Sequence, residues 1–326
     1  MLKYLSLFSG IGAFESALTN LGVNYEVVNY CEIDKYASKS YSAIHGVPET
    51  KNLWDITKVN VFNLPKPGEI DLVTYGFPCQ DISLAGNQKG LFNEDGTLTR
   101  SGLFFEALKV IEYCKPKVAI AENVKNLTSK KFDTQFETVL KSLEDAGYNN
   151  YWKVLNAKDY GIPQNRERVF IVSIRKDVDN ELFEFPKPYS LEKRVKDFLE
   201  PHVDEKYYLT DKKIQTIKTS ANDIGVVVCE ERKDEGLRFF KDNVCGSLRT
   251  TNSCGDKRVL QEDLRIRKLT PRECYRLMGF SDDEFEKAEK ANSNTQLYKQ
   301  AGNSIVVDVL EELFCMMLDE DGGFYI

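Results

Sequence analysis

A thiol and a carboxylate each follow a segment that the sequence predicts to be a strand. Cys79 comes shortly after the apolar, β-prone run 70–75, and Glu122 directly follows a second such run at 117–121. In an open α/β sheet the carboxyl ends of neighbouring strands meet at one crevice, so we expect the two side chains to share a site. A lone cysteine is more often a small buried residue than a nucleophile. The nearby acid is what favours a reactive thiol here.

A glycine turn near the N-terminus predicts a cofactor site. Residues 4–8 form a predicted strand, Gly10 and Gly12 lie in the turn that follows, and residues 13–21 have a helical pattern. This order of elements forms a cradle for a nucleotide or cofactor at the helix N-terminus. The dinucleotide fingerprint needs a third glycine at position 15, where this chain has Glu15, whose charge would repel a pyrophosphate. The turn therefore argues against a Rossmann-type oxidoreductase and favours a ligand without phosphate there.

Two further acids extend this candidate cofactor site. Glu32 ends a second predicted strand 20 residues after Gly12, a spacing that suits hydrogen bonds to ribose hydroxyls. Alternatively, Glu32 is an ordinary acid at the start of the next helix. Asp55 could accept a hydrogen bond from an exocyclic amine or could cap a turn, and the sequence leaves both interpretations open.

A long polar loop and two alternating arginines complete the candidate residues. Residues 80–100 form a loop of a length that is typical of lids and binding loops, with disorder as the alternative. Arg166 and Arg168 alternate, so an extended segment would place both on one face. They could clamp a phosphate or carboxylate there, or form salt bridges at a strand edge.

Composition excludes several classes of protein. The 326 residues are 42% hydrophobic and 29% charged, which is ordinary for a soluble protein of one or two domains. The chain has no run of 18 apolar residues and no signal-peptide layout, so we expect neither a membrane span nor export. Eight cysteines without a C-x-x-C pair, and only two histidines, give little support to a zinc site. We expect reduced thiols, no metal and a cytoplasmic location.

The pattern of elements predicts an α/β fold with a small, irregular, mostly β domain. We expect a catalytic and cofactor-binding domain at 1–184, the small domain at 185–264, and a return to the first domain at 265–326. The net charge is -7, yet residues 185–276 carry 20 Lys and Arg against 16 Asp and Glu. This mildly basic segment permits a phosphate-facing surface without demonstrating one.

Six short motifs resemble those of the DNA (cytosine-5) methyltransferases, in particular the compact enzymes of bacterial restriction-modification systems. They follow the family's order along the whole chain, at residues 8–12, 76–80, 122–124, 164–168, 267–273 and 300–304. Any one of them alone is a weak signal, and six in order are a strong one. One departure is that the family usually carries Thr-Leu in its recognition domain, where this chain has Ser247 and Leu248.

The resemblance implies a Rossmann-like methyltransferase sheet and an enzyme that transfers a methyl group from S-adenosylmethionine to carbon 5 of cytosine in duplex DNA, releasing S-adenosylhomocysteine. Cys79 would be the nucleophile, Glu122 the acid at the cytosine ring, and Arg166 and Arg168 would hold the site around the base. The implied cofactor contacts are Phe8, Gly10, Ile11, Gly12, Glu32, Ile33, Asp55, Pro78 and Asn303. The implied DNA contacts are Ser83, Asn87, Gln88, Lys89, Ser247, Leu248, Arg249 and Thr250.

This chemistry explains the residue types. Carbon 5 of cytosine is a poor nucleophile until a thiolate adds at carbon 6 and creates an enamine. Positive charge would favour the Cys79 thiolate, with Arg166 as the candidate, and a protonated Glu122 would hydrogen-bond N3 of the ring. The base must also leave the duplex, and residues of the 80–100 loop could fill the space it vacates.

Two alternative functions are a methyltransferase with another substrate and a DNA-binding protein without catalytic activity. One branch of the family acts on tRNA, but the sizeable 185–264 segment favours DNA. A non-catalytic DNA-binding protein would be expected to lack the thiol or the acid, and both are present. The implied partner is duplex DNA, together with a separately encoded restriction endonuclease unless the protein is an orphan or phage methylase. We expect a monomer, because one copy suffices for one flipped base.

Overall fold

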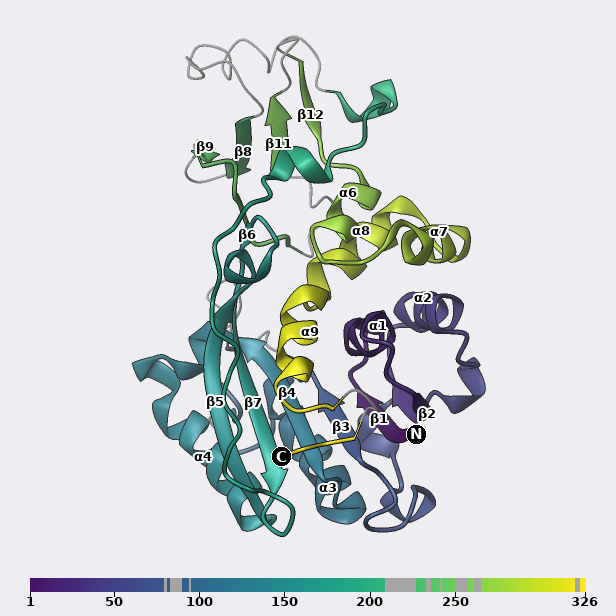
Figure 1. Cartoon of the computed structure of the whole chain (residues 1–326), viewed down its shortest axis with the longest axis vertical. Helices are drawn as coiled ribbons and strands as arrows, with labels where there is room; N and C mark the ends of the chain where they lie inside the picture. The colour runs from purple at the N-terminus through teal and green to yellow at the C-terminus, as the bar shows by residue number, and fades with distance from the viewer. Residues whose placement is uncertain are drawn as a thin grey trace. The chain divides into compact units, whose positions relative to one another are not determined.

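The structure is a computed structural model that falls into two compact units. The first comprises 1–155, 167–187 and 310–326, and the second 156–166 and 188–309 (Figure 1). Sequence analysis expected 265–326 to return to the first domain, whereas 265–309 group with the second unit. The functional division of the chain stays a prediction. The residues described are 1–78, 81–82, 90–93, 95–208, 227–232, 236–240, 242–249, 257–260, 265–319 and 323–326.

The first unit is built on a six-stranded sheet of order β2-β1-β3-β4-β7-β5. Its first four strands run parallel, and β7 is antiparallel to β4. Strands β1, β3 and β4 are buried almost throughout, as expected for parallel strands covered on both faces. The predicted α/β class is confirmed. The strands are β1 (Leu2–Leu7), β2 (Tyr25–Cys31), β3 (Leu72–Tyr75), β4 (Val118–Val124), β5 (Tyr148–Asn156) and β7 (Glu167–Arg175).

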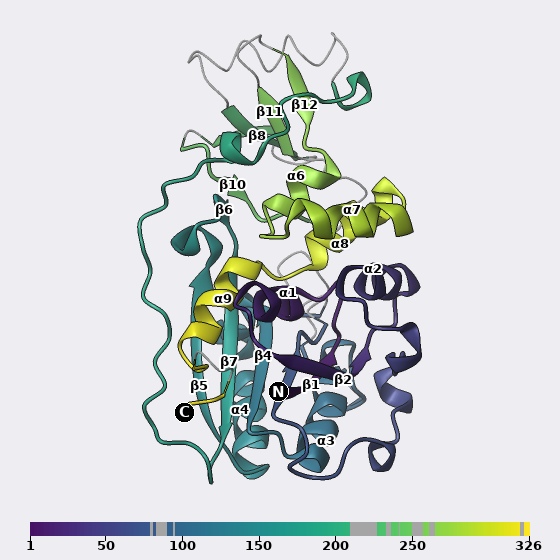
Figure 2. The same cartoon turned by 45° about the vertical axis from the view of Figure 1, so that its right-hand side comes forward.

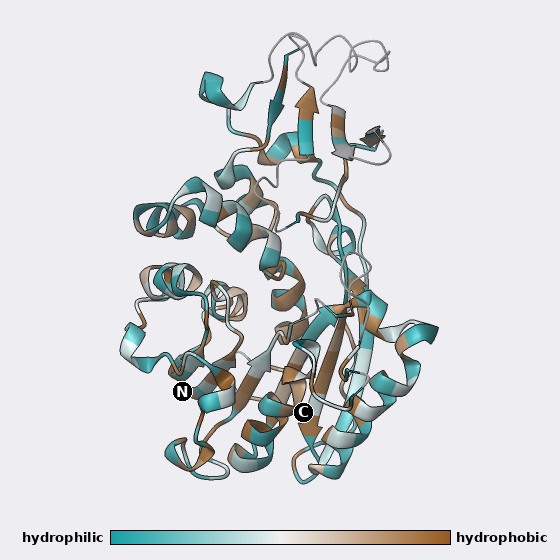
Figure 3. Ribbon diagram, turned by 180° about the vertical axis from the view of Figure 1, so that it is seen from behind, coloured by the Kyte–Doolittle hydropathy of each residue, from teal (hydrophilic) through white to brown (hydrophobic). Residues whose placement is uncertain are grey.

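Helices cover both faces of this sheet. Apolar residues of α3 (Phe104–Cys114) and α4 (Asp133–Asp145) form one core with the strands beneath them. On the opposite face lie α1 (Ala13–Asn20) and most of α9 (Val307–Cys315), as Figure 2 shows. The apolar strands and the polar outer faces of α3 and α4 are visible in Figure 3. Within the described ranges, no helix is long and apolar enough to cross a membrane.

Helix α2 (Lys35–His45) is fixed by its cap and by an aromatic stack. Asp34 accepts hydrogen bonds from the first backbone N–H groups of the helix. Gly46 ends it with a left-handed φ of 67°. The ring of Tyr41 in α2 stacks on Tyr30 of β2, with centroids 4.1 Å apart. This contact holds α2 against the edge of the sheet.

The second unit contains a four-stranded antiparallel sheet of order β12-β11-β8-β9 and a short parallel pair, β10-β6. Arg267 of β12 and Glu273 of α6 form a fully buried ion pair of 2.7 Å, and Glu273 also completes the capping box of Thr270. The elements are β6 (Gln164–Asn165), β8 (Val227–Arg232), β9 (Gly236–Phe240), β10 (Cys245–Gly246), β11 (Lys257–Leu260), β12 (Ile266–Lys268), α6 (Pro271–Arg276), α7 (Asp282–Ala291) and α8 (Asn294–Asn303).

Candidate active site

The turn after β1 has the left-handed backbone that its glycines permit. Phe8, Gly10 and Gly12 have φ of 52°, 59° and 85°. A Cβ on Gly10 would meet no atom within 4 Å, so a ligand can approach the backbone there. Gly12 is the N-cap of α1 and has no capping side chain, while the Ile11 side chain is buried beside it. The predicted order of strand, glycine turn and helix is confirmed, and its use as a cofactor site stays a prediction.

Glu15 is enclosed within the protein. Its side chain is fully buried, and the Tyr41 hydroxyl donates to Oε1 at 2.6 Å. The direct repulsion of a pyrophosphate that sequence analysis expected is therefore not supported, because the charge does not face the turn's open side. The argument against a dinucleotide rests on the missing third glycine alone.

Glu32 joins the tip of β2 to the glycine turn. The N–H of Gly10 donates to its Oε2 at 2.9 Å, and the N–H of Asp34 donates to Oε1 at 2.7 Å. Because Asp34 caps α2, Glu32 is not the helix-capping acid that the sequence left open. Ile33, the next residue, is 69% exposed beside this carboxylate.

Asp55 has the geometry of a turn cap. Its Oδ1 accepts hydrogen bonds from the N–H and hydroxyl of Thr57, at 3.1 and 2.8 Å. These bonds hold the pKa of Asp55 below its usual value, so the carboxylate stays ionised. The Asp55 side chain is 29% exposed, with Lys58 Nζ 3.6 Å from Oδ2. An exocyclic amine can therefore still reach an ionised acceptor.

The tips of β3 and β4 are tied together. Tyr75 pairs with Ala121 in the parallel register, so the chain leaves β3 beside Glu122. The Asn123 side chain donates a buried hydrogen bond of 3.0 Å to the Phe77 carbonyl, and Asn126 donates to the Ile82 carbonyl. Cys79 lies outside the described residues. The described chain on both sides of it is thus anchored to the segment that follows Glu122.

Glu122 forms an ion pair with Arg168. The antiparallel register of β4 and β7 brings the two residues together, and Arg168 Nε lies 2.9 Å from Glu122 Oε1. Both side chains are mostly buried, with 19% and 12% exposed. An ion pair stabilises a carboxylate relative to the carboxylic acid. The pairing thus acts in the opposite direction to the protonated Glu122 that sequence analysis expected.

Arg166 contacts backbone carbonyl groups, whereas Arg168 contacts the carboxylate of Glu122. Its guanidinium is buried and donates to the backbone carbonyls of Leu248, Gly302 and Ser304, at 3.0, 3.0 and 2.6 Å. Two of these carbonyls flank Asn303, which is exposed at the end of α8. Of the two alternatives that the sequence left open, Arg168 forms a salt bridge and Arg166 forms a set of backbone contacts.

Comparison with known proteins identifies the family. The profile for C-5 cytosine-specific DNA methylases matches residues 2–318. The chain belongs to this family. It is 37% identical to the type II methyltransferase M2.ScrFI of Lactococcus lactis subsp. cremoris, over 96% of this chain and 98% of that one. It is 35% identical to the type II methyltransferase M.HhaI of Haemophilus parahaemolyticus, over 95% and 92%.

A solved structure shares the fold of this methylase. The Entamoeba histolytica methyltransferase EhMeth matches with a TM-score of 0.73 and 19% identity, over 96% of each chain. The protein is accordingly a cytosine-5 DNA methyltransferase of a family that acts on DNA and uses S-adenosylmethionine.

The predicted base-reading segment of the methylase is anchored to the motif at 164–168. Ser247 Oγ donates to the Asn165 carbonyl at 3.1 Å, and the Leu248 N–H donates to Gln164 Oε1 at 2.9 Å. The Leu248 side chain is buried, which favours an anchoring role over base contact. Arg249 is exposed and pairs with Glu230 at 3.2 Å. The other predicted DNA contacts lie outside the described residues: Ser83, Asn87, Gln88, Lys89 and Thr250.

The described cysteines do not compete with Cys79 as nucleophiles. Burial raises the pKa of Cys31 and of Cys114 to about 12, which leaves almost no thiolate near neutral pH. Burial and nearby glutamates also raise the pKa of Cys315. The remaining described cysteines are buried, namely Cys229, Cys245 and Cys274.

His45 supports the glycine turn, and no motif in the sequence indicates this role. His45 Nε2 lies 2.9 Å from the Ile11 carbonyl oxygen, at hydrogen-bonding distance. A Cβ on Gly12 would come within 2.1 Å of the same nitrogen. The second glycine of the turn is therefore required by close approach of the imidazole as well as by its φ. No sequence spacing links position 45 to position 11.

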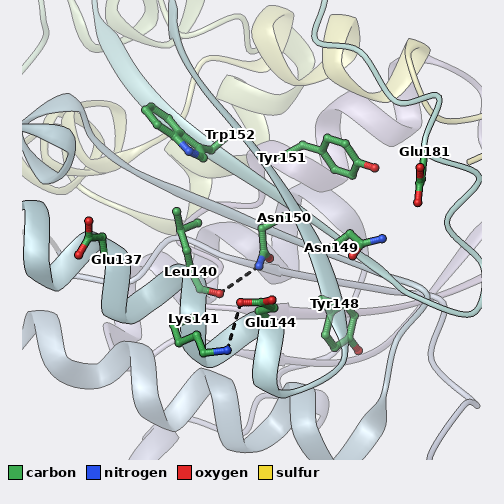
Figure 4. Close-up of a pocket in the computed structure, with 10 residues that line it drawn as sticks. All are labelled: Glu137, Leu140, Lys141, Glu144, Tyr148, Asn149, Asn150, Tyr151, Trp152 and Glu181. Carbon is green, nitrogen blue, oxygen red and sulfur yellow. Dashed lines mark hydrogen bonds and ion pairs between the residues drawn. The ribbon is translucent and has the colours of Figure 1, made fainter.

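A surface hollow of about 710 Å³ lies elsewhere, along the first half of edge strand β5 and helix α4 (Figure 4). Strand β5 begins at Tyr148, whereas the candidate site is at the carboxyl ends of β1 to β4. None of the predicted site residues lines this hollow, whose lining residues are Glu137, Leu140, Lys141, Glu144, Tyr148, Asn149, Asn150, Tyr151, Trp152 and Glu181.

Proposed function

We propose that this methyltransferase modifies carbon 5 of one cytosine within a specific duplex DNA sequence through a covalent adduct between Cys79 and carbon 6. The observation that carries the proposal is the Asn123–Phe77 hydrogen bond beside the Glu122–Arg168 ion pair. It ties the segment that leads to the thiol to the segment that holds the acid. Because β1 lies next to β3 in parallel, the glycine turn opens at the same sheet edge.

The residues of this edge fit S-adenosylmethionine, which supplies an electrophilic methyl group when bound. Open space above Gly10 would admit the cofactor against the backbone. Glu32 would accept hydrogen bonds from the ribose hydroxyls, and ionised Asp55 would accept one from the adenine amine. The other proposed cofactor contacts are those that the family resemblance implies, namely Phe8, Ile11, Gly12, Ile33, Pro78 and Asn303.

The proposed reaction begins when the Cys79 thiolate donates an electron pair to carbon 6 of the flipped cytosine. Glu122 would take up a proton from solvent as the base binds and donate it in a hydrogen bond to N3 while negative charge develops in the ring, and Arg168 holds that carboxyl group in place. Carbon 5 of the resulting enamine would form the new bond to the methyl group as the bond from that methyl group to the sulfonium sulfur breaks, with its electron pair going to sulfur. A base then removes the carbon 5 proton, and the electron pair expels Cys79 from carbon 6.

We infer that the 185–264 segment recognises the target sequence and that the 80–100 loop fills the duplex after base flipping. Arg166 would have an indirect role, because it would fix the backbone at Leu248 in the recognition segment and on both sides of Asn303. The protein would act as a monomer, without a metal. It would protect DNA from a separately encoded restriction endonuclease, or act alone as an orphan or phage methylase.

The test is methyl transfer from labelled S-adenosylmethionine to duplex DNA of varied sequence, with tRNA as the alternative substrate. Label should appear on cytosine in DNA, and Cys79→Ser should abolish transfer while retaining DNA binding. Cys315→Ser is the matched control, because that thiol is exposed and outside the proposed site. Label in tRNA alone would favour the tRNA enzyme. Equal transfer by Cys79→Ser would exclude the covalent mechanism.

A further inference from the structure

Asn52 is a buried amide whose four hydrogen-bonding positions are all used. Its Oδ1 accepts from the N–H of Glu32 at 3.0 Å and from the N–H of Trp54 at 2.8 Å. Its Nδ2 donates to the Glu32 carbonyl and to Ser38 Oγ, both at 3.0 Å. A side-chain amide offers two acceptor and two donor positions. At 7% exposure, Asn52 has little access to water that could replace these partners.

The backbone around Asn52 runs beside the end of β2. Asn52 forms a parallel bridge with Tyr30, and the Leu53 N–H donates to the Tyr30 carbonyl at 2.7 Å. Strand β2 ends at Cys31, so this pairing stops just before Glu32. Beyond that point, the Asn52 side chain takes over both backbone hydrogen-bonding groups of Glu32. One residue thus fixes the strand tip and the segment beside it.

The same side chain holds a strained residue next to Asp55. Trp54 has a φ of 61°, in the left-handed region that side chains other than glycine rarely adopt. Its N–H is bound by Asn52, and its carbonyl accepts a hydrogen bond from the Cys31 thiol at 3.1 Å. Such a conformation persists only where its surroundings enforce it. Loss of Asn52 would release Trp54 and so move Asp55.

Ser38 links Asn52 to the glycine turn through a buried cluster. Ser38 shares a hydrogen bond of 3.0 Å with the Tyr30 hydroxyl, and the Tyr30 ring stacks on Tyr41. The Tyr41 hydroxyl donates to Glu15, in the first turn of α1. Asn52 therefore contacts the tip of β2 and the segment at 54–55 directly, and it is linked to the glycine turn through Ser38, Tyr30 and Tyr41.

We propose that Asn52 is a positioning residue for S-adenosylmethionine, because it sets the backbones of Glu32 and Asp55 relative to each other. The inference rests on the proposed function, which assigns those two carboxylates to the ribose and the adenine. Asn52 has no role in methyl transfer itself. Its replacement should therefore weaken cofactor binding and leave DNA binding and the chemical step largely unchanged.

The test compares Asn52→Ala with Asn150→Ala in the full chain. Asn150 is a matched control because its amide donates to the Leu140 carbonyl at 3.0 Å and accepts from Ser173 at 2.6 Å, away from the site (Figure 4). Calorimetry gives the Kd of S-adenosylhomocysteine, and steady-state kinetics give KM for each substrate. Asn52→Ala should raise the Kd and the cofactor KM roughly tenfold or more, by analogy with the loss seen when a residue that orients a metal ligand is removed. The DNA KM and the single-turnover rate at saturating cofactor should change much less than the Kd, because Asn52 contacts neither DNA nor the reacting atoms in the proposed mechanism.

Asn52→Asp covers the case in which the alanine variant does not fold. It keeps the side-chain shape and the two accepted hydrogen bonds but loses both donated ones and places a buried carboxylate oxygen against the Glu32 carbonyl, so cofactor affinity should fall at least as far. Asn150→Ala should lower Tm without changing the Kd. Cofactor affinity in folded Asn52 variants equal to that of Asn150→Ala would overturn the proposal. If the unsubstituted protein does not bind S-adenosylhomocysteine, the proposed function fails instead.

Discussion

The pairing of Glu122 with Arg168 gives the proposed acid a defined orientation. Glu122 is one residue beyond the strand register that aligns β3 with β4, and Arg168 reaches it from β7. Three strands therefore determine where one carboxylate lies. Both side chains are mostly buried, so water could not readily replace a lost partner. Removal of either residue is therefore predicted to leave a buried charge without its counter-ion.

Glu122→Gln tests the acid. It removes the exchangeable proton while keeping a similar shape, so kcat should fall by roughly 10²- to 10⁴-fold, with a much smaller change in the DNA KM. Single-turnover methyl transfer measures the loss. A variant with a full single-turnover rate would contradict the role of Glu122.

Arg168→Ala tests the partner of that acid. It should lower the same rate by roughly 10- to 100-fold, because Glu122 loses its orientation. The neighbouring pair of Lys125 and Glu167 provides the control, at 2.8 Å but with about half of each side chain exposed. Lys125→Ala should leave the rate unchanged, since exposed ion pairs contribute little. Equal effects of the two substitutions would argue against a specific role for Arg168.

At the scale of elements, the glycine turn and helix α2 depend on each other. His45 at the end of α2 occupies the space above Gly12 and binds the carbonyl of Ile11. The turn that would receive the cofactor is thus held by a helix that follows it by more than 20 residues. Helix α2 in turn is fixed to β2 by the stacking of Tyr41 on Tyr30.

Gly12→Ala should be more harmful than Gly22→Ala. Both glycines have positive φ, at 85° and 71°, so each alanine should cost about 1–2 kcal/mol of stability from the backbone. Only the Cβ at position 12 would also collide with His45, at 2.1 Å. Urea unfolding should show the larger loss for Gly12→Ala, and adding His45→Ala should recover part of it. The same loss for both glycine variants would contradict the contact.

The tie between β3 and β4 is predicted to matter for stability and for catalysis. Asn123→Ala would leave the buried Phe77 carbonyl without its side-chain donor, at a cost of about 1–3 kcal/mol. Urea unfolding measures this loss, and methyl transfer should fall because the chain that leads to Cys79 is released. Unchanged stability with unchanged activity would show that the tie has neither role.

Across the whole molecule, local sequence patterns predicted the helices and strands of the site. The partners of the site residues depend instead on contacts between residues far apart in the chain. The strand, glycine turn and helix at 2–20 were predictable from the sequence. The apolar run of the strand, the glycines of the turn and the helical spacing that follows all lie within one short segment. The partner of Glu122 was not, since it depends on the register of β4 against β7. The sequence left open whether Arg166 and Arg168 clamp an anion or form salt bridges, and it could not indicate that the Arg166 guanidinium binds carbonyls 82 to 138 residues away.

The functional division of the chain stays a prediction. Residues 265–309, which the sequence assigns to the catalytic domain, have most of their contacts within the second unit. The buried pair of Arg267 and Glu273 joins β12 to α6 within that unit, and nothing in the spacing of the helices indicates it. The family motifs identified the enzyme class from the sequence. The residues that hold the site residues in place could be identified only from the structure.

In the proposed mechanism Cys79 bonds to the base that it modifies, and a trapped complex between the protein and DNA would reveal this bond. With duplex DNA that carries 5-fluorocytosine at the target site, methyl transfer can occur but fluorine cannot leave as a proton does, so the bond from sulfur to carbon 6 persists. The protein should form a denaturant-stable complex with this DNA in the presence of S-adenosylmethionine. Peptide mapping should place the nucleotide on Cys79, and Cys79→Ser should form none. A complex mapped to another residue, or methylation of normal DNA without any trapped complex, would contradict the account.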